Sequence, residues 1–239
     1  MNFYNWIIFL LFFNVAFGLA QKSSLESTYY ELFDSNIGPD NTNLYKGSVY
    51  TSKYRSINEF TPRLYFDYID GSILYDGQWY FRVSINYNVY DDLILMRLPM
   101  ASRNVLVQPL QQQVECFSME DRFFVHIDWE ELKGFYEQLL QFENFDLGLY
   151  RKLRKNRYKK NNRVHEYSEF YDREPIYYIK YDGKYYDLKS YKILKRLFPQ
   201  LSEVIVQGHK ENRNLSKIDV AAYYSRLLQI IYKNISINS

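Results

Sequence analysis

The chain has 239 residues, of which 47% are hydrophobic and 24% are charged, and its formal net charge is +2. A chain of this length and hydrophobicity can bury its own core, which excludes a disordered, collagenous or low-complexity protein. The single cysteine, Cys116, excludes an intramolecular disulfide framework and a zinc site made of cysteines. The composition is unusually aromatic, with 26 Tyr and 17 Phe, which favours β-strands.

The first twenty residues carry no charged side chain and include a dense apolar run at residues 6–13. Small side chains at Gly18 and Ala20 suit signal-peptidase cleavage before Gln21, so we expect a signal peptide over residues 1–20. The mature protein is then periplasmic or secreted. The alternative is an uncleaved N-terminal membrane anchor, because twenty uncharged residues are long enough to span a bilayer.

Residues 21–43 predict a polar N-terminal arm, and residues 44–188 predict an antiparallel β domain. The clearest strand covers residues 79–89, where Trp79, Phe81 and Val83 begin one face while Tyr80 and Arg82 lie on the other. Short apolar runs follow at intervals of about ten residues, as in a meander. The dipeptides at residues 76–77 and 182–183 are both Asp-Gly, which is typical of type I′ hairpin turns.

Residues 189–239 change to a helical period and predict C-terminal helices packed on the same domain. One helix begins after Ser190 and ends at Pro199, a second covers 200–209, and the last covers about 217–234. The predicted class is therefore α+β: mainly an antiparallel β meander, as a sandwich or open barrel, followed by two or three helices.

Charge is distributed unevenly along the chain. Residues 21–140 hold 10 basic and 17 acidic side chains, whereas residues 141–239 hold 20 basic and 11 acidic ones. Much of this excess lies in a basic run without any acid, formed by Arg151, Lys152, Arg154, Lys155, Arg157, Lys159, Lys160 and Arg163. Such a run can bind an anionic group. It can equally keep a surface solvated or dock on the acidic half of the same protein.

Tyrosines gather around the second predicted hairpin, at Tyr177, Tyr178, Tyr181, Tyr185 and Tyr186. Because side chains alternate along a strand, some of them could face outward and bind a sugar or a protein. The alternative is cross-strand aromatic pairing that stabilises the sheet.

The sequence carries no recognisable catalytic or phosphate-binding motif. His126 and Asp128 are two residues apart on a predicted strand and could face the same side, while Cys116 has no histidine near it in sequence. The acidic pairs at residues 91–92, 120–121 and 130–131 are interpreted as turn and surface residues. We therefore predict no catalytic residue, no metal site and no cofactor.

The order of several motifs resembles an uncharacterised family of exported proteins from Bacteroidota. The matching segments are Tyr75-Asp76-Gly77-Gln78-Trp79-Tyr80, Tyr90-Asp91, Gly134-Phe135-Tyr136-Glu137-Gln138-Leu139, the basic residues at 151–155, the hairpin at 177–186 and Leu197-Phe198-Pro199. The chain departs from the family in the region 141–146, where family members often carry a glycine turn. The resemblance implies export, with a periplasmic location expected, and it implies no activity.

Two functional hypotheses follow. The first is a non-enzymatic envelope protein that binds an envelope protein or an anionic envelope component through the basic run and the tyrosine-rich hairpin. Export makes a nucleic acid an unsuitable partner. The second is an enzyme that acts on an envelope polymer, with a pocket around His126, Asp128 and Cys116.

Overall fold

The structure is a computed structural model that describes residues 44, 46–56, 59–100, 103–142, 145–161 and 165–238. The predicted signal peptide, the predicted N-terminal arm and Arg163 lie outside the described residues.

Within the described part of the chain, eleven antiparallel strands form one open sheet. Their spatial order is β1-β5-β4-β3-β2-β6-β7-β8-β9-β10-β11. Two meanders, β2–β5 and β6–β11, are thus joined side by side where β2 pairs with β6. The strands are β1 (Gly47–Val49), β2 (Ile69–Tyr75), β3 (Gln78–Asn88), β4 (Leu93–Met100), β5 (Arg103–Pro109), β6 (Val114–Met119), β7 (Arg122–Trp129), β8 (Leu132–Phe142), β9 (Leu147–Asn161), β10 (Glu166–Tyr181) and β11 (Lys184–Asp187).

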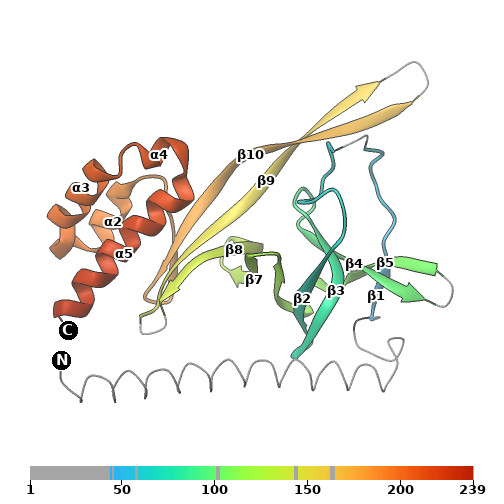
Figure 1. Ribbon diagram of the computed structural model, residues 1–239, viewed down its shortest axis with the longest axis horizontal. Coiled ribbons are helices and arrows are strands. Elements are labelled where there is room, and N and C mark those ends of the chain that lie inside the picture. The colour runs from blue at the N-terminus through green and yellow to red at the C-terminus, as the bar shows by residue number, and fades with distance from the viewer. Residues whose placement is uncertain are drawn as a thin grey trace, which may run out of the picture.

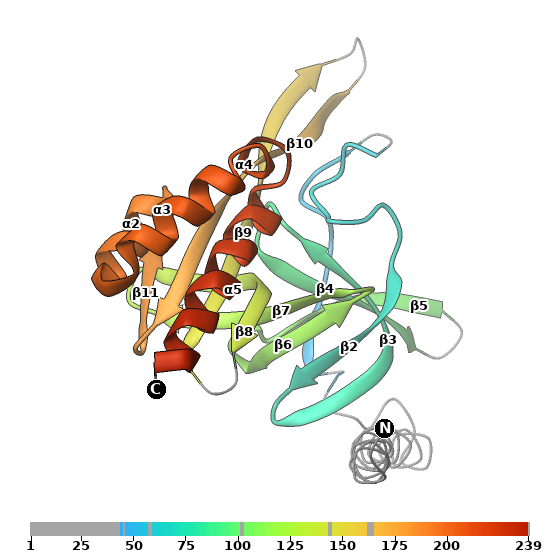
Figure 2. The ribbon, with the colours of Figure 1, turned by 60° about the vertical axis from the view of Figure 1, so that its left-hand side comes forward.

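The C-terminal part is helical, which confirms the predicted α+β class. The α-helices described are α2 (Tyr191–Leu197), α3 (Ser202–Glu211), α4 (Leu215–Ile218) and α5 (Val220–Asn238). They gather at one end of the molecule beside β9–β11, while β1–β5 lie at the opposite end (Figures 1 and 2).

Both predicted Asp-Gly turns are present. Asp76 and Gly77 have φ values of +53° and +74°, and Asp182 and Gly183 have values of +51° and +71°. A type I′ turn needs positive φ at both central residues, a conformation that glycine and aspartate tolerate better than most residues. These two turns fix the register of β2 with β3 and of β10 with β11.

A bulge in β3 interrupts the strict alternation that the sequence predicts for residues 79–89, so the prediction is wrong for the residues before the bulge. Val83 faces the core as expected, but before it Tyr80 is buried, at 1% exposure, while Trp79 and Phe81 are only half-buried. The pairing of β2 with β3 shifts between Gly71 and Ile73, and Arg82 has a φ of +54°. An extra residue in a strand reverses which side chains face the core, so the two halves of β3 bury opposite sets.

The first hydrophobic core lies among β2–β8. Phe117 and Phe124 stack in it with ring centroids 4.7 Å apart, and Tyr87 packs edgewise against Phe135. Asn86, which the sequence places on the polar face, is fully buried and contacts the backbone of Tyr65 and Asp67. Its Nδ2 donates to the carbonyl oxygens of Tyr65 and Asp67 at 2.9 and 2.7 Å, which satisfies the buried amide.

The second core joins β9 and β10 to the helices. Leu149 and Ile179 are cross-strand partners, fully buried against α2, α3 and α5. Tyr150 and Tyr178, the next pair along the strands, belong instead to a smaller cluster on the other face of the sheet. This end of the β9–β10 hairpin is therefore covered on both faces, whereas its other end projects beyond the helices (Figure 1).

Candidate functional site

The basic run lies along β9, and its first residue is held by a buried carboxylate. Glu137 on β8 is 3% exposed. Its Oε1 accepts the Nε of Arg122 at 2.8 Å, and its Oε2 accepts the Nε of Arg151, also at 2.8 Å. Two guanidinium groups from β7 and β9 thus share one carboxylate, so Arg151 ties three neighbouring strands together rather than facing a partner.

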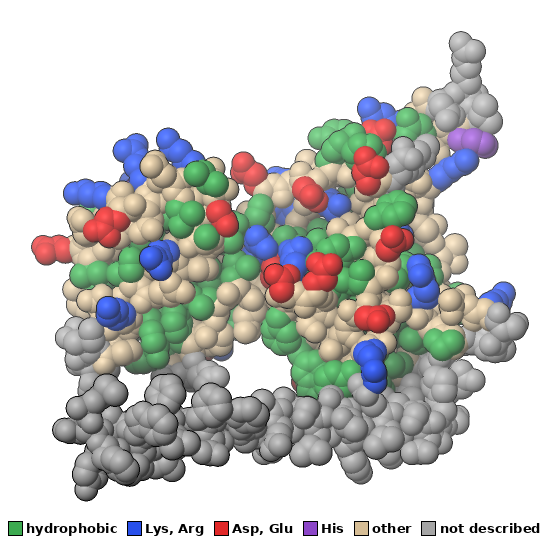
Figure 3. All heavy atoms as spheres, in the orientation of Figure 1, with side chains coloured by type: hydrophobic (Ala, Val, Ile, Leu, Met, Phe, Trp, Pro, Cys, Tyr) green, Lys and Arg blue, Asp and Glu red, His purple; other side chains and the backbone are tan. Residues whose placement is uncertain are grey.

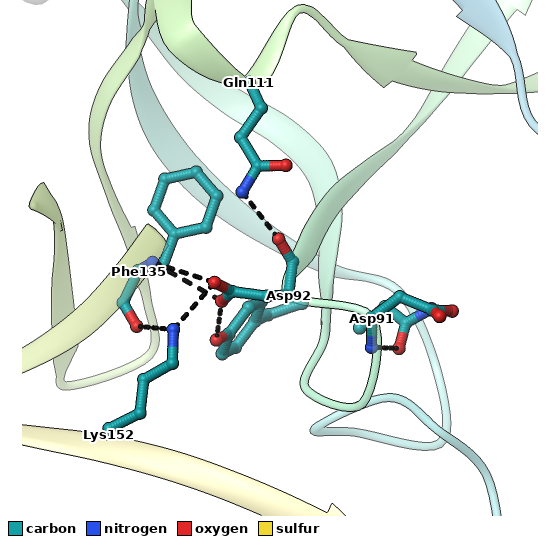
Figure 4. Close-up of polar contacts among 7 residues, drawn as sticks. Asp91, Asp92, Gln111, Phe135 and Lys152 are labelled. Carbon is teal, nitrogen blue, oxygen red and sulfur yellow. Dashed lines mark hydrogen bonds and ion pairs between the residues drawn. The ribbon is translucent and has the colours of Figure 1, made fainter. Parts of the chain in front are cut away.

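Lys152, the next basic residue, binds the β3–β4 turn (Figure 4). Its Nζ lies 2.7 Å from Oδ2 of Asp92 and donates to the carbonyl oxygen of Phe135 at 2.9 Å. Asp92 also accepts the Tyr87 hydroxyl at 2.5 Å, so its side chain turns inward, contrary to the surface role that the sequence predicts. Burial lowers the pKa of Lys152, and Asp92 opposes that shift.

Gly134 makes room for this contact. It adopts a φ of +96° in β8, and a Cβ at this position would overlap the Asp92 carboxylate. The backbone N–H of Phe135, the next residue, faces the same carboxylate at 3.4 Å. A residue with a side chain would therefore meet both backbone strain and a clash here.

The remaining described members of the basic run bind groups on β10. Lys155 pairs with Asp172 at 3.2 Å, Lys159 with Glu166 at 3.6 Å and Lys160 with Glu169 at 3.7 Å. Arg154 donates to the carbonyl oxygen of Glu174 at 3.0 Å, and Arg157 donates to the Ser168 hydroxyl at 2.9 Å. Basic and acidic side chains are accordingly interspersed on the face shown in Figure 3.

The five tyrosines of the second hairpin divide between the two faces of the sheet. Tyr177 contacts Tyr224 of α5 at 5.5 Å between ring centroids, and Tyr181 contacts Phe198 at 4.6 Å. Tyr186 packs against the same helical core. On the opposite face, Tyr178 and Tyr185 pack with Tyr136, Tyr150 and Trp129. All five are half-buried, so most of their contact area is already used within the protein.

The structure keeps His126 and Asp128 on one face of β7, as the sequence predicts, but separates Cys116 from them. Cys116 pairs across the sheet with Val125, so it shares a face with Val125, and the next residue, His126, faces the other way. Burial raises the pKa of the Cys116 thiol to about 11, which disfavours a nucleophilic thiolate. Asp128 forms an ion pair with Lys133. Among the described residues, no group of three or more His, Cys, Asp or Glu side chains is arranged to hold a metal ion.

One surface of the β9–β10 hairpin combines exposed aromatic and basic side chains. We call residues 154–161 and 166–173 the distal ribbon. Its inner face packs on the body, where Phe170 is 2% exposed and contacts Tyr54 and Tyr90 at 5.2 and 5.0 Å between ring centroids. Tyr158 and Tyr171 lie on the other, outward face and are 50% and 41% exposed.

Alternation along the two strands determines the rest of this outward face. Tyr158 lies opposite Glu169, and Tyr171 lies opposite Asn156. The two tyrosine rings contact each other edge to face, with centroids 5.7 Å apart. The same alternation places Arg154, Lys160 and Arg173 on the outward face. Among the ribbon residues on this face, Glu169 is the only acid. The outward face is thus aromatic and carries an excess of positive charge.

No family model matches the chain, and neither a curated protein nor a solved structure matches it. None of the helices in the part of the chain that the structure describes has the length and apolar character needed to cross a membrane.

Proposed function

We propose that the protein is an exported, non-enzymatic component of the envelope, and that the outward face of the distal ribbon binds an acidic surface of another envelope protein. Export rests on the apolar residues 1–20 and on the resemblance described above. Binding rests on the pair Tyr158 and Tyr171, whose large rings stay exposed on the ribbon, although Tyr171 also contacts Phe60 of the body at 5.0 Å between ring centroids.

The chemistry of this face is that of a protein interface. Tyrosine and arginine are enriched among residues that dominate binding energy, because they bury large areas while retaining a polar end. Tyr158 and Tyr171 form the aromatic centre, and Arg154, Lys160 and Arg173 surround it. Positive charge around an aromatic centre favours an acidic partner and speeds its association.

A protein suits this face better than an anionic membrane does. Attraction to a membrane depends on the number of uncompensated cations near the lipid surface. On the outward face of the distal ribbon, Lys160 pairs with Glu169 of β10. This pairing reduces the positive charge that lipids would encounter, whereas it leaves the two exposed rings available for a protein.

The proposal is tested by recovering the full chain, with a C-terminal affinity tag, from detergent-solubilised envelopes of cells that express it. We expect one co-purifying protein at low salt that weakens at high salt and disappears with the double variant Tyr158→Ala/Tyr171→Ala. Phe66→Ala is the matched control, since Phe66 is 59% exposed and lies outside the ribbon.

Two outcomes would contradict the proposal. In one, the double variant retains the same partner as the unaltered chain. In the other, the purified chain sediments with vesicles of anionic phospholipid, does not sediment with vesicles of phosphatidylcholine, and recovers no protein; the ligand would then be a lipid surface.

A further inference from the structure

A cavity of about 480 Å³ lies between the β10–β11 hairpin and the beginning of α5. This volume is within the range of pockets that hold small molecules. The cavity is separate from the outward face of the distal ribbon, because its lining begins at Glu174, where the ribbon ends, and continues into α5.

A bulge in β10 creates one wall of the cavity. The pairing of β10 with β9 shifts between Arg173 and Ile176, so Glu174 and Pro175 together oppose the single residue Leu153 and β10 carries one extra residue at this point. Proline suits a bulge because it has no N–H to leave unpaired in the ladder. Bulges re-aim side chains and are frequent beside binding sites. Here the bulge coincides with the point at which the ribbon leaves the helical end of the molecule.

The floor of the cavity is apolar and aromatic. Leu188 and Tyr224 are 3% and 6% exposed, and the ring of Tyr177 lies 5.5 Å from that of Tyr224. Burial raises the pKa of both tyrosines above its usual value, so both rings stay neutral throughout the physiological pH range. Val220, the first residue of α5, is 36% exposed and adds a more accessible apolar surface to the lining. A ligand body that is itself apolar would release water from this floor.

The charged side chains of the lining carry a negative excess. Glu174 and Asp187 contribute carboxylates, and Lys189 is the only cation of the lining. Lys189 already lies 3.3 Å from Asp187. Arg154 of β9 donates to the backbone carbonyl oxygen of Glu174 and not to its carboxylate, which leaves the exposed Glu174 carboxylate as the surplus charge. The positive end of α5 does not reverse this balance, because the Asp219 side chain accepts the N–H of Ala222 at 2.9 Å and caps the helix.

We infer that this cavity binds a small ligand with an apolar body and one cationic nitrogen. The body lies against Tyr177, Leu188 and Tyr224, and the nitrogen lies near Glu174. A charge-assisted contact of this kind favours a cation over an anion of the same shape.

The test compares two probes that share one apolar body, 4-phenylbutylamine and 4-phenylbutyrate, by isothermal titration calorimetry with the full chain. We expect the amine to bind about tenfold more tightly than the carboxylate, which is the size of effect that one charged contact produces. Val220→Trp should abolish binding by filling the cavity. Glu174→Gln should weaken the amine several-fold and reduce its preference over the carboxylate. Glu203→Gln, an exposed acid on α3, is the matched control and should change nothing.

Equal affinity for the two probes, or no binding of either, would overturn the inference. So would unchanged amine binding in Val220→Trp. Because Glu174 is exposed, Glu174→Gln removes its charge without disturbing a buried group. Thermal melting of each variant confirms that it is folded. Loss of the outward-face partner would not affect these titrations, which makes the two proposals separable.

Discussion

The two halves of the β9–β10 hairpin contain the same kinds of residue and use them differently. In the proximal half, residues 147–152 and 176–181, Arg151 and Lys152 bind Glu137 and Asp92, and the tyrosines pack between two hydrophobic clusters. In the distal ribbon, Lys159 and Lys160 make longer ion pairs across the hairpin, and Tyr158 and Tyr171 stay exposed.

This difference shows that residue type does not decide the role of a basic or aromatic side chain. What decides it is whether another element covers the strand. Strands β8 and β11 and the helices cover the proximal half, so its charges are paired internally and its rings are buried. The distal ribbon receives cover mainly on its inner face, which leaves its outward face exposed.

The largest expected effect comes from breaking the buried charge cluster of the proximal half. Glu137→Ala leaves Arg122 and Arg151 without their shared carboxylate, and losing one partner of a buried ion pair typically lowers the free energy of unfolding by about 3–5 kcal/mol. Urea denaturation measures the loss. The distal control is Glu169→Ala, for which we expect at most about 1 kcal/mol because its lysine partner is exposed. Equal losses would show that the two halves do not differ as described.

The next effect is expected at Gly134, beside the contact between Asp92 and Lys152. Gly134→Ala should lower the free energy of unfolding by at least about 2 kcal/mol, because it combines backbone strain at positive φ with the clash against Asp92.

Gly77→Ala is the matched control for this prediction. Gly77 also has a positive φ, of +74°, but nothing lies within 4 Å of an added Cβ. It should therefore show the backbone contribution alone, about 1 kcal/mol. In an Asp92→Ala background, Gly134→Ala should become less destabilising; a purely additive double variant would contradict the proposed clash.

A smaller effect separates the tyrosines of the two halves. Tyr181→Ala removes a half-buried ring that packs on Phe198, and we expect a loss of about 2 kcal/mol, below the value for a fully buried aromatic residue. Tyr158→Ala should change the free energy of unfolding by less than about 0.5 kcal/mol, as for other surface substitutions. Chemical denaturation of the two variants measures both changes in the free energy of unfolding. Similar losses would show that Tyr158 stabilises the fold as Tyr181 does, which would contradict the comparison.

The smallest expected effect is a pH dependence at His126. Burial lowers the pKa of this histidine below its usual value of 6.5, with Lys152 adding to the shift and Asp92 and Asp128 opposing it. The folded state then binds fewer protons than the unfolded state just below pH 6.5, so stability falls as the pH drops through this region. In His126→Gln, the free energy of unfolding should fall less between pH 7.5 and pH 5.5 than it does in the unaltered chain. Urea denaturation at several pH values measures this, and an unchanged pH dependence would contradict the assignment of the effect to His126.

The parts of the fold that the sequence predicts correctly depend on local signals. The two Asp-Gly turns need only two residues. Helix α2 begins directly after Ser190 and ends before Pro199, as predicted, although the Ser190 side chain makes no capping hydrogen bond. The bulge at Arg82 is different, because it arises from the pairing of β3 with β2. Strict alternation in one strand therefore predicts the core residues after the bulge and misassigns Trp79, Tyr80 and Phe81 before it.

The charge clusters could not be located from the sequence for a related reason. Lys152 and Asp92 are 60 residues apart, and nothing in either neighbourhood indicates the other. The unequal charge of the two halves of the chain suggested that the basic run could dock on the acidic half, which the contacts of Arg151 and Lys152 confirm for those two residues. The charge pattern alone did not separate Arg151 and Lys152 from Lys159 and Lys160. Which lysines and arginines bind the body depends on where β8 stops pairing with β9.

Photo-crosslinking in intact cells shows whether the outward face of the distal ribbon contacts a partner. A benzophenone amino acid replaces Tyr158 in one variant and Phe66 in another, since both positions are exposed. We expect a discrete protein adduct from position 158 that is absent from position 66. Adducts that are the same from both positions, or an adduct from position 66 alone, would contradict it.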